Sequence, residues 1–549
     1  MGIFIYEATS HSITMEEWKN VYDETLLLME KLPFAERGTI SRGGEKGICL
    51  VRSEEREYVN GDKKSRRWRT CGDYNTGKTA EEYYLWSDAV KEDKIVPEAG
   101  DAILALIPKE VRERFPEDDL RFKQGWSIWD AKTQGEPYHN LVLAVACLLE
   151  DRLGYKAFVF GDITRGQCKK AVSIANQVLE KPIDVPARCD LNRFFERISK
   201  IPLNSGEKLD LFTEYYLGEH NAEFYEFVNK NFPRDVVWEG WEKEFSSYLP
   251  GTRGFSSTLK KYLTAGFGLK DLCRITKFED KEGRPLYEAF IKAVMDTKMH
   301  IEDKDTKDLL DIDQEREAPY GVWALFAEFS LGSAHNYKVD CYVPAEEIRE
   351  TLRECIRDKF DVDAYMDQYL KEEKDSLEKL KGQELNEDNL EEKVKSDPAG
   401  TLAEMIDKRA ESEKELRKEY DCVDPEDFLY YEKGDRIPPK REEWIKGNFK
   451  IYHEVLEEDS YKELLEDDPD RRCGFLLQQN RQFLLRDCDW ERIFSDIESR
   501  KEAFSRYYPM VRLDFGADSL IHLIKAYLLN DDFYEWVESL PDGEQPTAG

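Results

Sequence analysis

Residues 138–190 read YHNLVLAVACLLEDRLGYKAFVFGDITRGQCKKAVSIANQVLEKPIDVPARCD, and this stretch predicts a helix, a strand and a second helix in succession. Apolar residues are nearly continuous over 140–149, which indicates a helix buried on most of its circumference. The β-branched and aromatic run at 156–160 predicts a short strand. Asp162 or Thr164 can cap the helix that follows. These three elements form the core of the first predicted domain.

The region before this stretch predicts a mixed α/β domain that covers residues 1–185. Thr14 and Glu17 have the spacing of a capping box ahead of an amphipathic helix. Residues 47–72 alternate apolar and polar side chains around Asn60-Gly61, which predicts an antiparallel hairpin or meander. The remaining predicted elements are a strand at 2–8, a helix at 80–90 and strands at 102–108 and 125–130.

After residue 185 the periodicity becomes helical, so the predicted fold class is α+β, with a mixed N-terminal domain and predominantly α-helical domains after it. Residues 186–360 predict a second, α-helical domain whose aromatic residues form a core. In 371–420, 27 of 50 residues are charged, and we interpret 361–424 as a charged helical connector. Amphipathic helices return in 425–549, which predicts a C-terminal helical domain.

Composition restricts the classes of function. The chain carries 115 acidic and 81 basic residues, a net charge of −34, which disfavours nucleic acid and anionic membranes as partners. No apolar run approaches the ~18 residues of a membrane span, and the pattern of the first residues does not predict a secretory leader. Eleven cysteines are scattered without CxxC pairs, and no histidine spacing suggests zinc. We therefore expect a cytoplasmic protein with reduced thiols and no metal.

The sharpest motif is GDYNTGKT at 72–79, which matches the phosphate-loop pattern GxxxxGK[ST]. In such a loop Gly72 and Gly77 would let the backbone wrap a phosphate, Lys78 would neutralise it, and Thr79 would reach Mg²⁺ at a helix start. The preceding RRWRTC alternates like one arm of a hairpin, whereas a phosphate loop follows a buried parallel strand. Nucleotide binding and an ordinary loop before a helix both remain open.

The second candidate is the turn GDITRGQ at 161–167, between the predicted strand and helix. Asp162 could act as a nucleophile, general base or cation ligand, and Thr164 and Arg165 could hold an anion at the helix start. His139 precedes the first helix of the stretch and is a candidate to share this site. The alternative is structural, because Asp162 and Thr164 can satisfy the free amides of the helix.

The chain resembles uncharacterised bacterial proteins of no assigned function in two segments, EDRLGYKAFVFGDITRGQCKKAV at 150–172 and KPIDVPARCD at 181–190. The resemblance covers about 55 residues. It implies a bacterial cytosolic origin and carries no activity and no catalytic residue to this chain.

Two classes of function stay open. The first is a non-enzymatic protein-binding or interaction protein, which the absence of a complete catalytic motif and the extensive amphipathic helix favour. The second is an enzyme or sensor that binds a nucleotide or phosphorylated small molecule through residues 72–79 or the Asp162 turn. The sequence identifies no cofactor, and a ligand-induced rise in melting temperature would separate the two classes.

Overall fold

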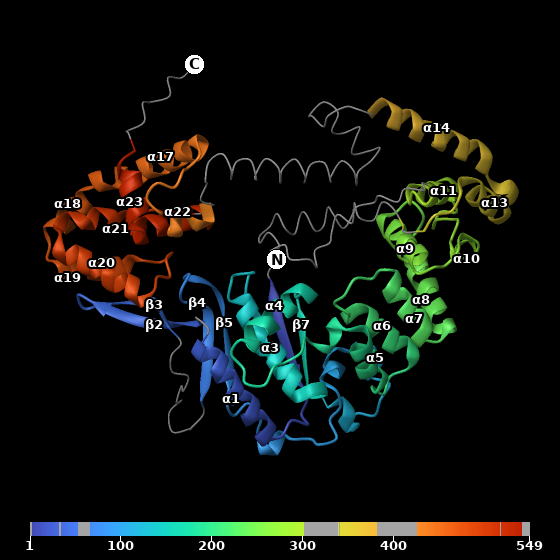
Figure 1. The fold of residues 1–549 in the computed structure, drawn as a ribbon, viewed down its shortest axis with the longest axis horizontal. Coiled ribbons are helices and arrows are strands. Elements are labelled where there is room, and N and C mark those ends of the chain that lie inside the picture. Colours follow the sequence, from blue (N-terminus) through green and yellow to red (C-terminus); the bar gives the residue numbers. More distant parts are fainter. Residues whose placement is uncertain are drawn as a thin grey trace.

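A computed structural model describes residues 3–31, 34–52, 66–123, 125–300, 339, 341–380, 425–515 and 518–540. It confirms the α+β class, because two antiparallel sheets near the N-terminus precede a long series of helices. We name residues 3–189 the sheet unit, residues 190–380 the middle helical unit and residues 425–540 the C-terminal helical unit. The sheet unit lies between the two helical units (Figure 1).

The first sheet has the order β6-β1-β7 and is antiparallel throughout. It comprises β1 (Phe4–Thr9), β6 (Trp126–Lys132) and β7 (Ala157–Gly161). Its helices are α1 (Met15–Lys31), α3 (His139–Leu153) and α4 (Arg165–Asn176), and α3 contacts both other helices and β7. Because it is surrounded in this way, α3 tolerates apolar residues on nearly every face. The predicted helix, strand and helix are therefore confirmed.

The second sheet has the order β3-β2-β4-β5. Its strands are β2 (Phe34–Arg42), β3 (Glu45–Arg52), β4 (Arg67–Asp73) and β5 (Lys78–Trp86). A two-residue turn joins β2 to β3, and both of its residues, Gly43 and Gly44, have positive φ angles of 58° and 79°. The predicted Asn60-Gly61 turn lies outside the described residues. The predicted pairing of the strands beside it is wrong, because β2 lies between β3 and β4.

Two predicted elements have a different secondary structure from the one expected. The expected helix at 80–90 is wrong, since β5 pairs with β4 and alternates buried Tyr83 and Leu85 with outward-facing Tyr84. The expected strand at 102–108 is also wrong, because η2 (Ala102–Leu106) is a short 3₁₀ helix. The Asp101 carboxylate caps it by accepting a 2.9 Å hydrogen bond from the Ile103 N–H.

The middle helical unit is helical between 191 and 296, as predicted for this part of the chain, whereas residues 301–338 of the predicted helical region lie outside the described residues. Its core is continuous with part of the sheet unit, since Ile103 of η2 and Phe158 of β7 belong to the same buried cluster. The helices are α5 (Leu191–Ser199), α6 (Ser205–Tyr215), α7 (Ala222–Asn231), α8 (Arg234–Ser247), α9 (Arg253–Thr264), α10 (Leu269–Ile275), α11 (Tyr287–Asp296), α13 (Ala345–Ile356) and α14 (Val362–Leu380).

The C-terminal helical unit has its own core, and this core includes Ile40 of β2 and Cys49 of β3. The β2–β3 hairpin thus packs with helices more than 400 residues away in sequence. The longer helices are α17 (Pro439–Glu454), α18 (Asp459–Glu466), α19 (Pro469–Gln479), α20 (Asp487–Ser499), α22 (Asp518–Leu529) and α23 (Asp531–Glu538). Across the described parts of the chain, no helix combines the length and apolar character that crossing a bilayer requires.

Candidate functional site

The predicted phosphate loop is the turn of the β4–β5 hairpin. Gly72 pairs with Thr79 and Asp73 with Lys78, so Lys78 begins a strand and not a helix. The Asp73 carboxylate stabilises the turn by accepting a 2.8 Å hydrogen bond from the Asn75 N–H. A phosphate loop needs a helix N-terminus behind a buried parallel strand, and this antiparallel hairpin provides neither.

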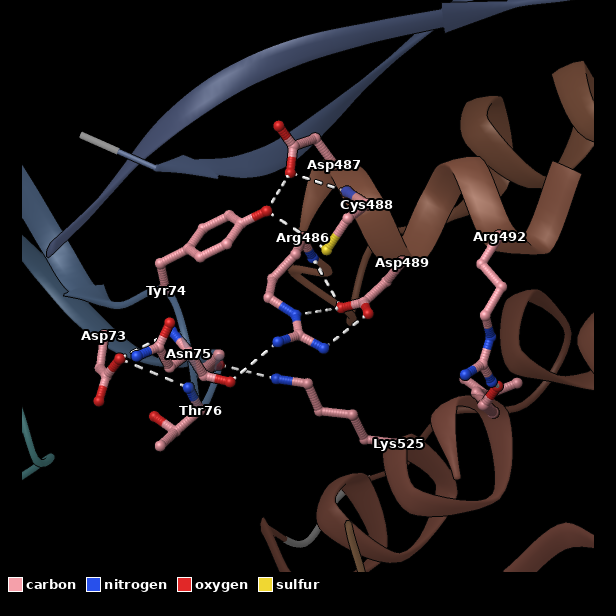
Figure 2. Close-up of polar contacts among 12 residues, drawn as sticks. Asp73, Tyr74, Asn75, Thr76, Arg486, Asp487, Cys488, Asp489, Arg492 and Lys525 are labelled. Atoms are coloured by element: carbon pink, nitrogen blue, oxygen red, sulfur yellow. Dashed lines mark hydrogen bonds and ion pairs between the residues drawn. The ribbon is translucent and has the colours of Figure 1, made fainter. Parts of the chain in front are cut away.

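The same turn is packed against the C-terminal helical unit. Figure 2 shows Tyr74, Asn75 and the neighbouring turn residues facing α20 and α22. The Tyr74 hydroxyl donates to Asp487 Oδ1 at 2.6 Å, and Arg486 Nη1 donates to the Asn75 carbonyl at 2.9 Å. Lys525 Nζ donates to the carbonyl oxygen of Gly77 at 2.7 Å. The residues of the predicted nucleotide site therefore form an intramolecular contact.

Burial of the Lys525 amine at this contact lowers its pKa to about 8, although the Asp489 carboxylate acts in the opposite direction. The neighbouring Arg486 forms a two-point ion pair with Asp489, with its Nε 2.7 Å from Oδ2 and its Nη2 2.8 Å from Oδ1 (Figure 2). The basic groups beside the turn thus have partners within the protein.

The Asp162 turn is engaged in local structure. Asp162 donates its N–H to the Phe4 carbonyl at 2.9 Å and accepts from the Phe4 N–H through Oδ2 at 3.0 Å, which extends the β1–β7 ladder. Of the two predicted caps, Thr164 is the one that caps α4, and it forms a capping box with Gln167. Arg165 is the first residue of α4 and is half-buried. The sheet here is antiparallel, so the turn does not lie at the ligand-binding edge of a parallel sheet.

His139 is brought near this turn but is buried. Its Nδ1 lies 2.7 Å from the Thr133 hydroxyl, and its Nε2 has no hydrogen-bond partner. Burial lowers the pKa of His139 to about 4, while Gln167 and the Asp162 carboxylate act in the opposite direction. The imidazole is therefore neutral near pH 7, and neither His139 nor Asp162 lines the cavity that lies beside α5.

A cavity of about 600 Å³ lies elsewhere, between the sheet unit and the start of the middle helical unit. Its walls come from the end of α3, from the segment that leads into α5, and from α5 itself. Eight charged side chains line it, and these are Asp101, Arg121, Glu150, Asp151, Arg193, Glu196, Arg197 and Lys200. The other large lining side chains are Tyr155, Val185, Pro186, Ile201 and Pro202.

Arg197 lies at the inner side of this cavity, and all three nitrogens of its guanidinium group donate hydrogen bonds. It binds both oxygens of Asp101, at 2.9 and 2.8 Å, and its Nη1 lies 3.2 Å from Glu150 Oε1. Its Nη2 also donates to the carbonyl oxygens of Tyr155, at 3.2 Å, and Ala157, at 2.8 Å. Arg197 is consequently a fixed structural group and has little donor capacity left for a ligand.

β7 lies at an edge of its sheet, and these buried charged side chains form hydrogen bonds with backbone groups on its outer side. Glu150 Oε2 accepts from the Val159 N–H at 3.0 Å, and Arg188 Nη1 donates to the Val159 carbonyl at 3.1 Å. Arg197 satisfies the Ala157 carbonyl in the same way. Unpaired strand edges are prone to aggregation, so side-chain capping of β7 explains why these costly buried charges are present.

Glu7 on β1 is fully buried near this cluster, and neither of its carboxylate oxygens has a hydrogen-bond partner. Burial raises the pKa of Glu7 well above its usual range, and the nearby Glu150 charge raises it further. The opposing effect of Arg197 is smaller. The folded protein therefore favours a protonated Glu7.

The cations at the mouth of the cavity are held much less firmly. Arg193 lies 3.8 Å from Asp184, and these side chains are 42% and 80% exposed. Lys200 pairs with Glu196 on the surface of the same helix, and Arg121 pairs with Asp119 beside the opening. The Arg193–Asp184 and Lys200–Glu196 pairs contribute little, because water screens both charges. Arg121 is held more firmly, since it contacts both carboxylate oxygens of Asp119, whose side chain is only 11% exposed. A ligand anion can therefore compete for Arg193 and Lys200.

The only sequence feature that points to the cationic side of the cavity is the spacing of three basic residues. Arg193, Arg197 and Lys200 are separated by four and three residues, a spacing that places them on one face of α5. No motif pattern covers such a stripe, and Asp101 and Glu150 join it only through the tertiary fold. Sequence reasoning consequently assigned these residues to an ordinary helix.

Comparison with protein-family models, with curated proteins and with solved structures found no match for this chain. Within the described ranges, no group of three or more His, Cys, Asp or Glu side chains is arranged to hold a metal ion. The site is therefore interpreted from its own geometry.

Proposed function

We propose that the protein binds a small organic anion, a phosphate ester or a carboxylate, in the cavity beside β7. The observation that carries this proposal is the cluster of Arg121, Arg193 and Lys200 around the opening of a cavity of about 600 Å³. The whole chain has a net charge of −34, whereas the cavity lining carries four basic and four acidic side chains, so the cavity is less acidic than the protein as a whole. Binding, and not catalysis, is the proposed activity.

The size and lining of the cavity support a small molecule. Ligand pockets usually have volumes of ~300–1,000 Å³, combine apolar walls with a few polar groups, and often lie between structural units. The apolar side chains of Val185, Pro186 and Ile201 provide such a wall. The Arg197 cluster fixes the inner surface before a ligand arrives, which lowers the entropic cost of binding.

The proposed ligand class includes the phosphorylated small molecules of the second sequence-based hypothesis, but the proposed binding site is the cavity beside β7. Phosphate binding was expected at 72–79 or at the Asp162 turn, whose polar groups serve the β4–β5 hairpin contact and the α4 cap instead. The cavity offers cations whose present partners are solvent-exposed.

A protein partner, which the sequence analysis favoured, is the second candidate. The observation that favours it is the exposure of Leu120 and Tyr155, 44% and 51%, beside the charged mouth of the cavity. A partner that carries an acidic group could insert it between the cations and cover these apolar side chains. A soluble small anion and an acidic peptide are separated by direct titration of each.

The test is a thermal-shift screen with ribose 5-phosphate, phosphoserine, succinate and citrate. A ligand at 100 times its dissociation constant stabilises the folded protein by about 2.7 kcal/mol, which is readily detected. The double variant Arg193→Gln with Lys200→Gln should abolish the shift. Its matched control is Lys243→Gln with Arg274→Gln, which removes two cations that are 77% and 68% exposed and do not line the cavity.

The control variant should retain the shift seen with the unchanged protein. If no phosphate ester or carboxylate raises the melting temperature, the proposed function is wrong. If the shift survives in the Arg193 and Lys200 variant, the ligand binds at another place and the proposal also fails.

A further inference from the structure

We infer that the ligand of this cavity is a nucleoside monophosphate, an inference that rests on the proposed function and narrows it to one chemical class. The lining residues fall into three chemical groups, namely exposed cations, exposed carboxylates and an apolar wall with an aromatic ring. A nucleoside monophosphate presents a matching group to each of them. These are its phosphate, its ribose hydroxyls and its base.

The charge balance favours a single phosphate group. Four carboxylates line the cavity, and Arg197 contacts two of them, Asp101 and Glu150. Asp151 is held by Arg152 Nη1 at 2.6 Å and by the Asp184 N–H at 2.9 Å. A dianion matches the two weakly paired cations, Arg193 and Lys200, whereas each further phosphate would add negative charge next to the carboxylates of Asp151 and Glu196.

The carboxylates also suit the sugar. Ribose hydroxyls are hydrogen-bond donors, and a carboxylate is the strongest acceptor a side chain offers them. Glu196 lies between Arg193 and Lys200 in the sequence of α5, and its side chain is 70% exposed at the cavity. A bound phosphate would replace Glu196 as the partner of Lys200, which leaves this carboxylate to accept from a hydroxyl.

The base is assigned to the aromatic and proline-rich wall. Tyr155 lines the cavity with its side chain half exposed, and Pro186, Ile201 and Pro202 add apolar surface. Flat aromatic bases stack favourably on such rings, and the affinity gained is largely independent of base identity. We therefore expect weak discrimination among the four common bases.

Isothermal titration calorimetry with AMP, GMP, CMP and UMP tests this inference, with adenosine and ribose 5-phosphate as truncated ligands. Each monophosphate should bind at least ten times more tightly than adenosine or ribose 5-phosphate. Tyr155→Leu should weaken monophosphate binding by about 5-fold to 100-fold and leave ribose 5-phosphate binding unchanged. The matched control, Tyr248→Leu, alters another tyrosine with an exposed side chain, outside the cavity, and should change neither affinity.

The inference is overturned if the monophosphates bind no more tightly than ribose 5-phosphate, or if Tyr155→Leu weakens both ligands equally. In that case, ribose 5-phosphate binding that is lost in the Arg193 and Lys200 variant would still support the proposed function. Loss of all anion binding in the unchanged protein would instead reject both proposals.

Discussion

Arg197 and Asp101 form a two-point ion pair, Nε to Oδ2 at 2.9 Å and Nη2 to Oδ1 at 2.8 Å, although 96 residues separate them. Asp101 also caps η2 in the sheet unit, and Arg197 belongs to α5 in the middle helical unit. This pair therefore joins the two units at the inner side of the cavity and fixes its shape.

Arg197→Ala should destabilise the protein by about 3–5 kcal/mol, because it leaves Asp101, Glu150 and two backbone carbonyls without their partner. Urea unfolding followed by circular dichroism measures the change. The neighbouring Arg193→Ala is the control and should alter the free energy of unfolding by less than about 0.5 kcal/mol, since its side chain is largely exposed. Equal effects of the two substitutions would contradict the structural role of Arg197.

Glu7→Gln should make stability less sensitive to rising pH. The raised pKa means that folded Glu7 holds its proton more tightly than unfolded Glu7, whose ordinary value is 4.5. The resulting stabilisation is complete below pH 4.5 and is lost as the pH rises from there through the folded pKa. Glutamine does not titrate, so the stability of the variant should fall less than that of the unchanged protein as the pH rises from 5 to 8.

Chemical unfolding at both pH values tests this expectation. Glu16→Gln is the control because Glu16 is exposed at the start of α1. A Glu7→Gln variant whose stability follows the pH dependence of the unchanged protein would show that Glu7 is not held in its protonated form.

Tyr74→Phe should weaken the contact between the β4–β5 hairpin and the C-terminal helical unit. It removes a 2.6 Å hydrogen bond to the Asp487 carboxylate, and hydrogen bonds to charged groups contribute about 1.5–3 kcal/mol. Faster amide exchange at residues 75–77 would report the loosened turn. Tyr84→Phe, on the neighbouring strand, should leave this exchange unchanged.

Lys78→Ala should not affect the binding of any phosphorylated ligand, because Lys78 is the first residue of β5 and does not line the cavity. The phosphate-loop hypothesis makes the opposite prediction, since its lysine neutralises the bound phosphate. Titration of ribose 5-phosphate into both proteins decides between them. A loss of affinity of tenfold or more in Lys78→Ala would restore the loop at 72–79 as the binding site.

The sequence was most informative where local rules determine the structure. The capping box at Thr14 was recognised because it depends on two residues three positions apart, and Thr164 was recognised as one of two possible caps of α4. The buried helix α3 was recognised because its apolar run is too continuous for a surface helix.

The errors arose where tertiary pairing overrides local pattern. Tyr83 and Leu85 alternate with period two, but the flanking acidic residues also suit an amphipathic helix, and only pairing with β4 decides for the strand. Similarly, the apolar run of η2 is buried against the middle helical unit and has no strand partner.

The candidate site could not be predicted because its parts are distant in sequence. Asp101, Glu150 and Arg197 come from η2, α3 and α5, and none lies in a motif with a fixed spacing. The predicted candidates had such spacings, yet Gly77 and Thr164 serve a turn and a helix cap.

A small anion bound in the cavity beside β7 should protect the backbone that lines it, and hydrogen–deuterium exchange with and without ribose 5-phosphate or AMP detects this protection. We predict slower exchange in residues 100–101, 150–155 and 185–202 when either ligand is saturating, and no change in residues 72–79 or 161–167. Protection confined to either of those two turns, or no protection with either ligand, would contradict the account.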